Sequence, residues 1–119
     1  MISIVDDDAI VREATLNLVR SLGFTGAAFA SAEEFLGSDT VNHTACLIAD
    51  VQLPGLSGIE LQTRLRTVGN QTPVIFMTAF PEGRIQAQAL DAGAIGFLSK
   101  PYDADSLIDC IDKALHGPH

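Results

Sequence analysis

The residues best suited to chemistry in this sequence are polar side chains at or just after the ends of short apolar runs. They are Asp6, Asp7, Asp50, Thr78 and Lys100. If the apolar runs are neighbouring parallel strands, their carboxyl ends meet at one edge of a sheet, where open α/β proteins bind ligands. Carboxylates gathered in this way repel one another, so they require a cation or raised pKa values. The sequence therefore predicts an acidic cation site at a sheet edge.

Such a site could carry phosphoryl chemistry. Oxygen ligands with few fixed positions suit Mg²⁺ (or Mn²⁺), which keeps several waters and accepts phosphate oxygens. Lys100 and Thr78 could bind the remaining oxygens of a phosphoryl group, and Asp50 is a candidate nucleophile because carboxylates form aspartyl-phosphates. Each residue alone has a plainer explanation: Asp8 and Asp50 could be helix caps, and Lys100 a surface charge. We prefer the functional interpretation because four strand ends carry such groups together.

Five segments are expected to form the strands that position these residues, at 2–5, 25–29, 45–50, 74–77 and 95–98. The run 45–50 is unbroken and is followed by the turn residues Pro54 and Gly55, which is typical of a strand buried on both faces of a parallel sheet. The weaker segment 25–29 is predicted to be an edge strand.

Segments with helical periodicity separate these strands. The predicted buried stripes are Val11, Ala14, Leu18 and Leu22; Gly58, Leu61, Leu65 and Val68; Ile85 and Ala89; and Leu107, Ile111, Ala114 and Leu115. The predicted helix starts are a capping box of Ser31 with Glu34, a cap at Ser57, Pro81 near a first turn and a cap at Asp103, and the predicted ends are Gly23, Gly37, Gly69, Gly93 and Gly117. Residues 38–44 are predicted to be a polar loop.

Strands and helices thus alternate five times, which predicts right-handed crossovers and a parallel sheet with helices on both faces. We expect residues 1–119 to form one doubly wound α/β domain.

Composition narrows the functional classes. The formal net charge of −8 argues against nucleic acid as a partner of this segment. No apolar run approaches the roughly 20 residues of a membrane span, and no signal peptide is apparent. Cys46 and Cys110 are expected to be buried free thiols in a reducing cytoplasm. No metal or phosphorelay role is expected for His43, His116 or His119, and the glycines form no nucleotide-binding motif.

Four motifs carry a resemblance to a known family: Val-Asp-Asp-Asp at 5–8, Asp-Val-Gln-Leu-Pro-Gly-Leu-Ser-Gly at 50–58, Met-Thr-Ala at 77–79 and Phe-Leu-Ser-Lys-Pro at 97–101. In that order and spacing they resemble the CheY-like receiver domains of bacterial two-component response regulators. Residues 31–36 and 53–58 are similar to the receivers of FixJ-like transcription factors. The resemblance implies the flavodoxin-like sheet order 2-1-3-4-5.

The resemblance also implies roles for individual residues. Asp50 would accept a phosphoryl group from a sensor histidine kinase. Asp7, Asp50 and the backbone carbonyl of Gln52 would bind Mg²⁺ directly, and Asp6 through water. Lys100 would pair with the phosphoryl group, and Thr78 and the Ala79 N–H would donate to it. Phe97 falls at the switch aromatic, and Lys100-Pro101 at a bond that is usually cis.

The expected function is therefore a phosphorylation-controlled cytoplasmic switch without turnover of an external substrate. If Thr78 moves toward the phosphoryl group, Phe97 is expected to turn inward to fill the void. A homodimer is expected to follow, through the fourth helix, fifth strand and fifth helix, from about Glu82 to Leu115. The expected output is transcription, through a DNA-binding domain absent from this segment.

Two alternatives stay open. A metal-dependent phosphohydrolase with an aspartyl-phosphate intermediate would typically have a second Asp two residues after the first, where this chain has Gln52. A receiver that acts only as an unphosphorylated binding module is disfavoured by the intact set of acids.

Overall fold

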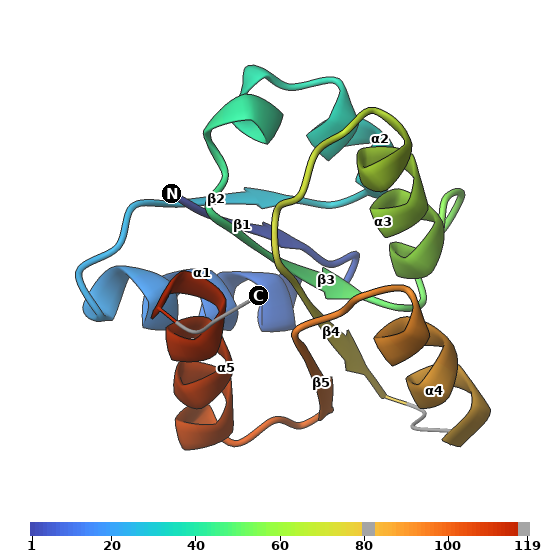
Figure 1. Ribbon diagram of the computed structural model, residues 1–119. Coiled ribbons are helices and arrows are strands. Elements are labelled where there is room, and N and C mark those ends of the chain that lie inside the picture. Colours follow the sequence, from blue (N-terminus) through green and yellow to red (C-terminus); the bar gives the residue numbers. More distant parts are fainter. Residues whose placement is uncertain (80–82, 117–119) are drawn as a thin grey trace.

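The computed structural model describes residues 1–79 and 83–116. Its centre is a parallel sheet of five strands, with helices on both sides (Figure 1). The strands are β1 (Ile2–Val5), β2 (Gly26–Phe29), β3 (Cys46–Asp50), β4 (Val74–Thr78) and β5 (Gly96–Ser99). Their order is β2-β1-β3-β4-β5, which confirms both the predicted flavodoxin-like order and the edge position of the second strand.

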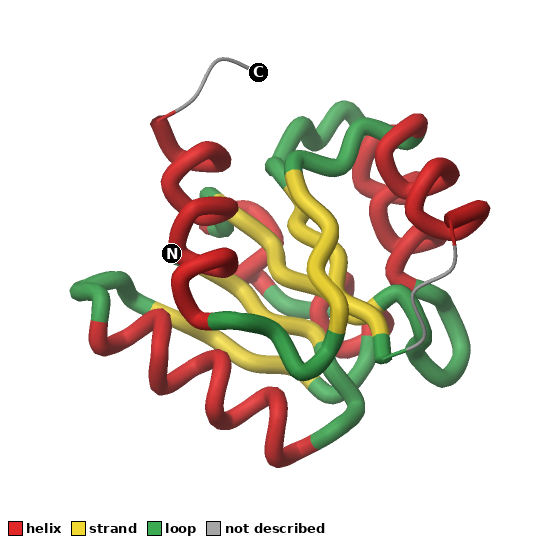
Figure 2. Tube along the Cα trace, turned by 90° about the horizontal axis from the view of Figure 1, so that it is seen from below, coloured by secondary structure: helices red, strands yellow, loops and turns green. Residues whose placement is uncertain are grey.

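The helices divide between the two faces of the sheet (Figures 1 and 2). They are α1 (Ala9–Ser21), α2 (Ala32–Leu36), α3 (Gly58–Thr67), α4 (Gly83–Asp91) and α5 (Ala104–His116). Buried residues of α1 and α5 form one core cluster with Ile48 of β3, while α2, α3 and α4 share the opposite cluster with Leu47. Successive strand residues point to opposite faces, so β3 serves both cores and is buried throughout.

Two predicted helix stripes need correction. In α1 the buried positions are Thr15 and Val19, while the predicted Ala14 and Leu22 are exposed. The buried stripe of α1 is therefore rotated by about one position from the predicted stripe. The prediction missed this rotation because it did not count a threonine as a core residue. The other correction concerns α3.

In α3 the structure buries Gly58, Leu61 and Leu65 as predicted, and it also buries Gln62. The predicted Val68 is 78% exposed. Val68 is the C-cap, so it follows the last helical residue and no longer shares the buried face of the helix.

The segment predicted as a polar loop contains a 3-10 helix, η1 (Asp39–His43). Short 3-10 turns carry no apolar periodicity, so the sequence pattern gave no sign of it. The Thr44 hydroxyl donates to the Thr40 carbonyl oxygen at 2.7 Å and so stabilises this turn.

The predicted helix ends are largely as expected. Ser31 accepts from the Glu34 N–H at 3.1 Å, but the reciprocal capping box is found at Ser57 and Glu60. Gly23 follows α1 with a φ of 92°, the left-handed conformation expected of a glycine that ends a helix. The helix start predicted at Pro81 and the end predicted at Gly117 lie outside the described residues.

Candidate functional site

The predicted acids meet at the carboxyl ends of β1 and β3. These strands are neighbours, with Val5 opposite Ala49, so Asp6 and Asp50 leave the sheet side by side. One carboxylate oxygen from each of Asp6, Asp7 and Asp50 lies within 4.8 Å of the others. Asp6 is fully buried and Asp50 is 6% exposed, whereas Asp7 is exposed. The three side chains therefore form an acid cluster that solvent reaches from the Asp7 side.

Lys100 joins this acid cluster from the far side of β4. Its backbone N–H donates to the Thr78 carbonyl oxygen at 2.7 Å, which fixes where the side chain begins. Its Nζ lies 2.5 Å from Asp50 Oδ2 and 2.8 Å from Asp6 Oδ2. One ammonium thus bridges the two buried carboxylates.

Burial and charge shift the pKa values of Asp50 and Lys100. Burial raises the pKa of Asp50 above the usual range for aspartate, although the Lys100 ammonium and the Gln52 N–H oppose this shift. Burial alone would lower the pKa of Lys100, but its contacts with Asp50 and Asp6 outweigh that effect and raise the pKa. Lys100 therefore stays cationic at neutral pH.

Backbone donors orient the carboxylates. The Gln52 N–H donates to Asp50 Oδ1 at 2.8 Å, and the Asp8 N–H donates to Asp6 Oδ1 at 2.9 Å. Asp8 is the N-cap of α1, as its simpler interpretation predicted, and it accepts from the Ile10 N–H at 3.0 Å. The outer oxygens of Asp6 and Asp50 consequently face each other and Lys100.

The remaining predicted residues surround the acid cluster. Thr78 is buried at the end of β4, and Ala79 follows it at the surface. Phe97 pairs with Phe76 in the β4–β5 register, so Phe97 lies on the same face of the sheet as Thr78, on the side of α4. Its ring is partly buried. The peptide bond before Pro101 is cis, as the resemblance implied.

The side chains present fit a divalent metal ion. The three carboxylates and the one ammonium leave two formal negative charges uncompensated. All the donors of the acid cluster are oxygens, which is the set that Mg²⁺ prefers. Asp6 Oδ2 is buried and accepts no hydrogen bond from the described residues, although it lies beside the Lys100 ammonium.

The sequence gave no sign of two contacts that hold the surrounding segments. Arg12 Nη1 donates to the Asp6 carbonyl oxygen at 2.9 Å, which ties α1 to the residue after β1. The hydroxyls of Thr15 and Tyr102 are 2.7 Å apart and link α1 to the segment that carries Lys100. Only an aromatic hydroxyl two residues after the lysine could have suggested the second contact.

A cleft of about 300 Å³ opens beside Lys100. It is lined by Ile10, Val11, Ala14, Lys100, Pro101 and Tyr102. Ile10 is 81% exposed at its rim. Lys100 lines this cleft, whereas Asp6, Asp7 and Asp50 do not.

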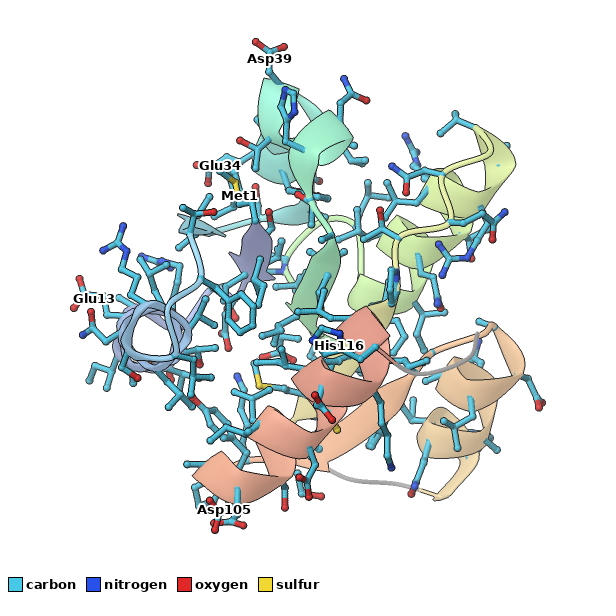
Figure 3. All side chains as sticks on the ribbon, turned by 60° about the vertical axis from the view of Figure 1, so that its left-hand side comes forward. Met1, Glu13, Glu34, Asp39, Asp105 and His116 are labelled. Carbon is cyan, nitrogen blue, oxygen red and sulfur yellow. The ribbon has the colours of Figure 1, made fainter. Side chains whose placement is uncertain are left out.

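The described histidines and the two cysteines are not part of the acid cluster. His43 is exposed in η1, and His116 is exposed at the end of α5 (Figure 3), while His119 is outside the described residues. Cys46 and Cys110 are free thiols, and burial raises the pKa of Cys46 to about 12. Within the described residues, no helix has the length and apolar character needed to cross a membrane.

Comparisons with known proteins bear on the family of this chain. A family model for the response regulator receiver domain matches residues 2–112. Nodulation protein W of Bradyrhizobium diazoefficiens is 40% identical over 114 residues, which cover 96% of this chain and 50% of that protein. Transcriptional regulatory protein FixJ of the same organism is 34% identical, over 96% of this chain and 56% of that protein. The chain thus spans about half the length of the curated relatives it matches.

Solved structures show the same fold. The response regulator StyR superposes with a TM-score of 0.88 at 40% identity, over 96% of this chain and 58% of that one. The structure named FixJ-N gives a TM-score of 0.87 at 28% identity, over 99% and 94% of the two chains.

Proposed function

Because the chain belongs to the response regulator receiver domain family, we propose that Asp50 accepts a phosphoryl group from a sensor histidine kinase. The whole of residues 1–119 forms this receiver in our proposal. The observation that carries it is the position of Asp50, which ends the central strand within reach of two further carboxylates and one ammonium.

In the proposed reaction, a carboxylate oxygen of Asp50 attacks phosphorus while the bond from phosphorus to the donor's imidazole nitrogen breaks. The products are an aspartyl-phosphate and a histidine that takes up a proton. Lys100 keeps its ammonium at neutral pH and neutralises charge on the transferred oxygens. Thr78 and the Ala79 N–H are the proposed donors to the remaining oxygens.

Asp7, Asp50 and the Gln52 carbonyl would hold Mg²⁺ (or Mn²⁺) directly, and Asp6 would hold it through water. When bound, the ion supplies positive charge that offsets the repulsion within the acid cluster. The chain's own contribution is orientation, because Asp6 and Asp50 are each fixed by a backbone N–H.

Intact mass spectrometry after incubation with acetyl phosphate and Mg²⁺ tests the assignment. Wild type should gain one phosphate, and Asp50→Asn should gain none. Asp8→Asn is the matched control, because the same chemical change is made next to Asp6 and Asp7 of the acid cluster, while asparagine still caps the helix. Equal phosphate incorporation by Asp50→Asn and wild type would contradict the assignment of Asp50 as the phosphoacceptor.

Receiver domains are signalling switches, and we propose that this one releases its phosphate slowly and turns over no external substrate. Thr78 and Phe97 would couple phosphorylation to the surface. They lie on one face of the sheet in neighbouring strands, and Phe97 is only partly buried, so its ring can be buried further. Packed interiors tolerate voids poorly, so a shift of Thr78 would draw the ring in.

The proposed result is a homodimer through α4, β5 and α5. The predicted start of this face, Glu82, lies outside the described residues. Sedimentation with and without beryllofluoride should show a shift from monomer toward dimer. Thr78→Ala should weaken the shift while phosphate incorporation persists, and an unchanged response of that variant would contradict the coupling route.

Transcriptional control is the proposed output, because the matched relatives include proteins named transcriptional regulators and extend well beyond the region they share with this chain. A DNA-binding domain outside this segment would carry it. A cytoplasmic location is part of the same proposal, and two free thiols are in keeping with a reducing compartment.

A further inference from the structure

The loop between β3 and α3 contains Gln52, a proposed metal ligand, but few hydrogen bonds hold the backbone of this loop. It begins at Val51, whose carbonyl oxygen accepts from the Gly58 N–H at 2.9 Å, and that bond closes its base. Between the base and the Ser57 cap, the Gln52 N–H donates to Asp50. The tip of the loop, Gly55 and Leu56, lies beyond both of these supports.

A side chain from α2 reaches this tip. Glu33 Oε2 accepts from the Leu56 N–H at 3.2 Å, across a sequence separation of 23 residues. Within residues 1–79 and 83–116, it is the one hydrogen bond recorded for the backbone of residues 53–56. Gly55 has a φ of 76°, and a Cβ at this position would overlap Glu33 Oε2. The carboxylate therefore rests directly against the turn.

We propose that Glu33 is a positioning residue that holds the β3–α3 loop in the conformation that presents Gln52 to the metal and phosphoryl site. This inference deepens the proposed function and rests on it. It assigns to α2, which contributes no side chain to the acid cluster, a part in how tightly that site binds its cation.

The elements at both ends of the contact are held in place. Ser31 caps α2, and Phe35 is buried in the core that α2 shares with α3, so Glu33 projects from an anchored turn. In the loop, Leu53 and Leu56 pack against the same core, and Pro54 has a fixed φ. Only three residues separate Leu56 from Gln52, so a displacement at Leu56 acts close to the proposed ligand.

A double-mutant cycle tests the contact itself. The single variants are Glu33→Ala and Gly55→Ala, and the measurement is the midpoint of thermal unfolding. Gly55→Ala should lower the midpoint more in wild type than in Glu33→Ala, because the overlap with the carboxylate exists only in the former. The cost of the positive φ is common to both backgrounds and cancels. If the effects of the two substitutions on the midpoint simply add, the proposed contact between Glu33 and the turn is wrong.

Two further measurements test the positioning role in folded protein. Mg²⁺ affinity, from amide shifts of Gln52 and Leu56, and the rate of phosphate uptake from acetyl phosphate should each fall about fivefold in Glu33→Ala. Glu33→Gln keeps an oxygen that can accept from Leu56 and should recover most of the loss. The matched control is Glu34→Ala, the neighbouring exposed carboxylate labelled in Figure 3, which should match wild type.

The outcomes separate this inference from the proposed function. If wild type takes no phosphate and binds no Mg²⁺, both are wrong. If wild type does both and Glu33→Ala equals it, the proposed function stands and the positioning role is wrong. An equal loss in Glu34→Ala would also overturn the role, because it would make the effect one of general surface charge.

Discussion

The two ends of the sheet are both polar, but their polar groups are of different kinds. At the amino end, the hydroxyls of Ser3 and Thr44 are 2.7 Å apart in the interior, and Thr44 also donates to a carbonyl of η1. At the carboxyl end, Asp6 and Asp50 share one ammonium, and Asp7 adds a third carboxylate.

The two ends differ in which partners can complete the hydrogen bonds and balance the charges of their polar groups. A hydroxyl both donates and accepts, so neutral hydroxyls satisfy one another without a ligand. Ionised carboxylates only accept, and they repel one another, so a single lysine leaves the carboxyl end incomplete. The amino end is therefore a structural connection, and the carboxyl end is the proposed site for a cation and a phosphoryl group.

Lys100→Gln should have the largest effect. Loss of the ammonium removes the charge that faces the transferred oxygens, and uptake of phosphate from acetyl phosphate should slow by about a hundredfold. The counterpart at the amino end is Arg66→Gln, which removes a bond from Arg66 Nη1 to the Asn70 carbonyl oxygen. Uptake by that variant should equal wild type, and comparable slowing in both variants would remove the distinction between the two ends. Intact mass measured over time gives both rates.

Asp7→Ala should weaken Mg²⁺ binding about tenfold while the protein stays folded. Asp7 is exposed, so the change removes repulsion and a metal ligand without emptying the core. Titration followed by amide shifts in NMR measures the affinity, and circular dichroism reports the fold. An unchanged affinity would mean that the acid cluster binds its cation without this residue.

The pH dependence of Mg²⁺ binding should reflect the raised pKa of Asp50. Its carboxylate takes up a proton at higher pH than an ordinary aspartate, so affinity should be constant near neutrality and fall as the pH is lowered through that pKa. The loss should therefore begin at a higher pH than it would for an aspartate with an ordinary pKa. Asp50→Asn should give weaker and flatter binding, and an equally steep profile in that variant would assign the proton to another group.

Ser3→Ala should have the smallest effect, and on stability alone. The Thr44 hydroxyl keeps its bond to η1, so the free energy of unfolding should fall by about 1 kcal/mol, measured by urea denaturation. Mg²⁺ affinity and phosphate uptake should match wild type. A change in either would show that the two ends of the sheet are coupled.

Much of the architecture was readable from local pattern. The unbroken run at residues 45–50 predicted the buried central strand, found at Cys46–Asp50, and the alternation of segments predicted the parallel sheet. Errors arose where burial contradicts residue type, as with Thr15 and Gln62, or where a helix ends one residue early, as at Val68. Hydrophobicity is only a proxy for burial. The Thr15 hydroxyl is buried with the Tyr102 hydroxyl as its partner, whereas neither amide atom of the buried Gln62 side chain has a hydrogen-bond partner among the described residues.

By itself, the sequence determined which residues carry charge at the strand ends, because strand and helix periods are local properties of the chain. Only the tertiary structure decided which of them meet. Lys100 reaches Asp50 across 50 residues, Tyr102 reaches Thr15 across 87, and Glu33 reaches Leu56 across 23. Each contact depends on how helices and strands pack and which rotamers that packing leaves free, and no local pattern encodes those distances.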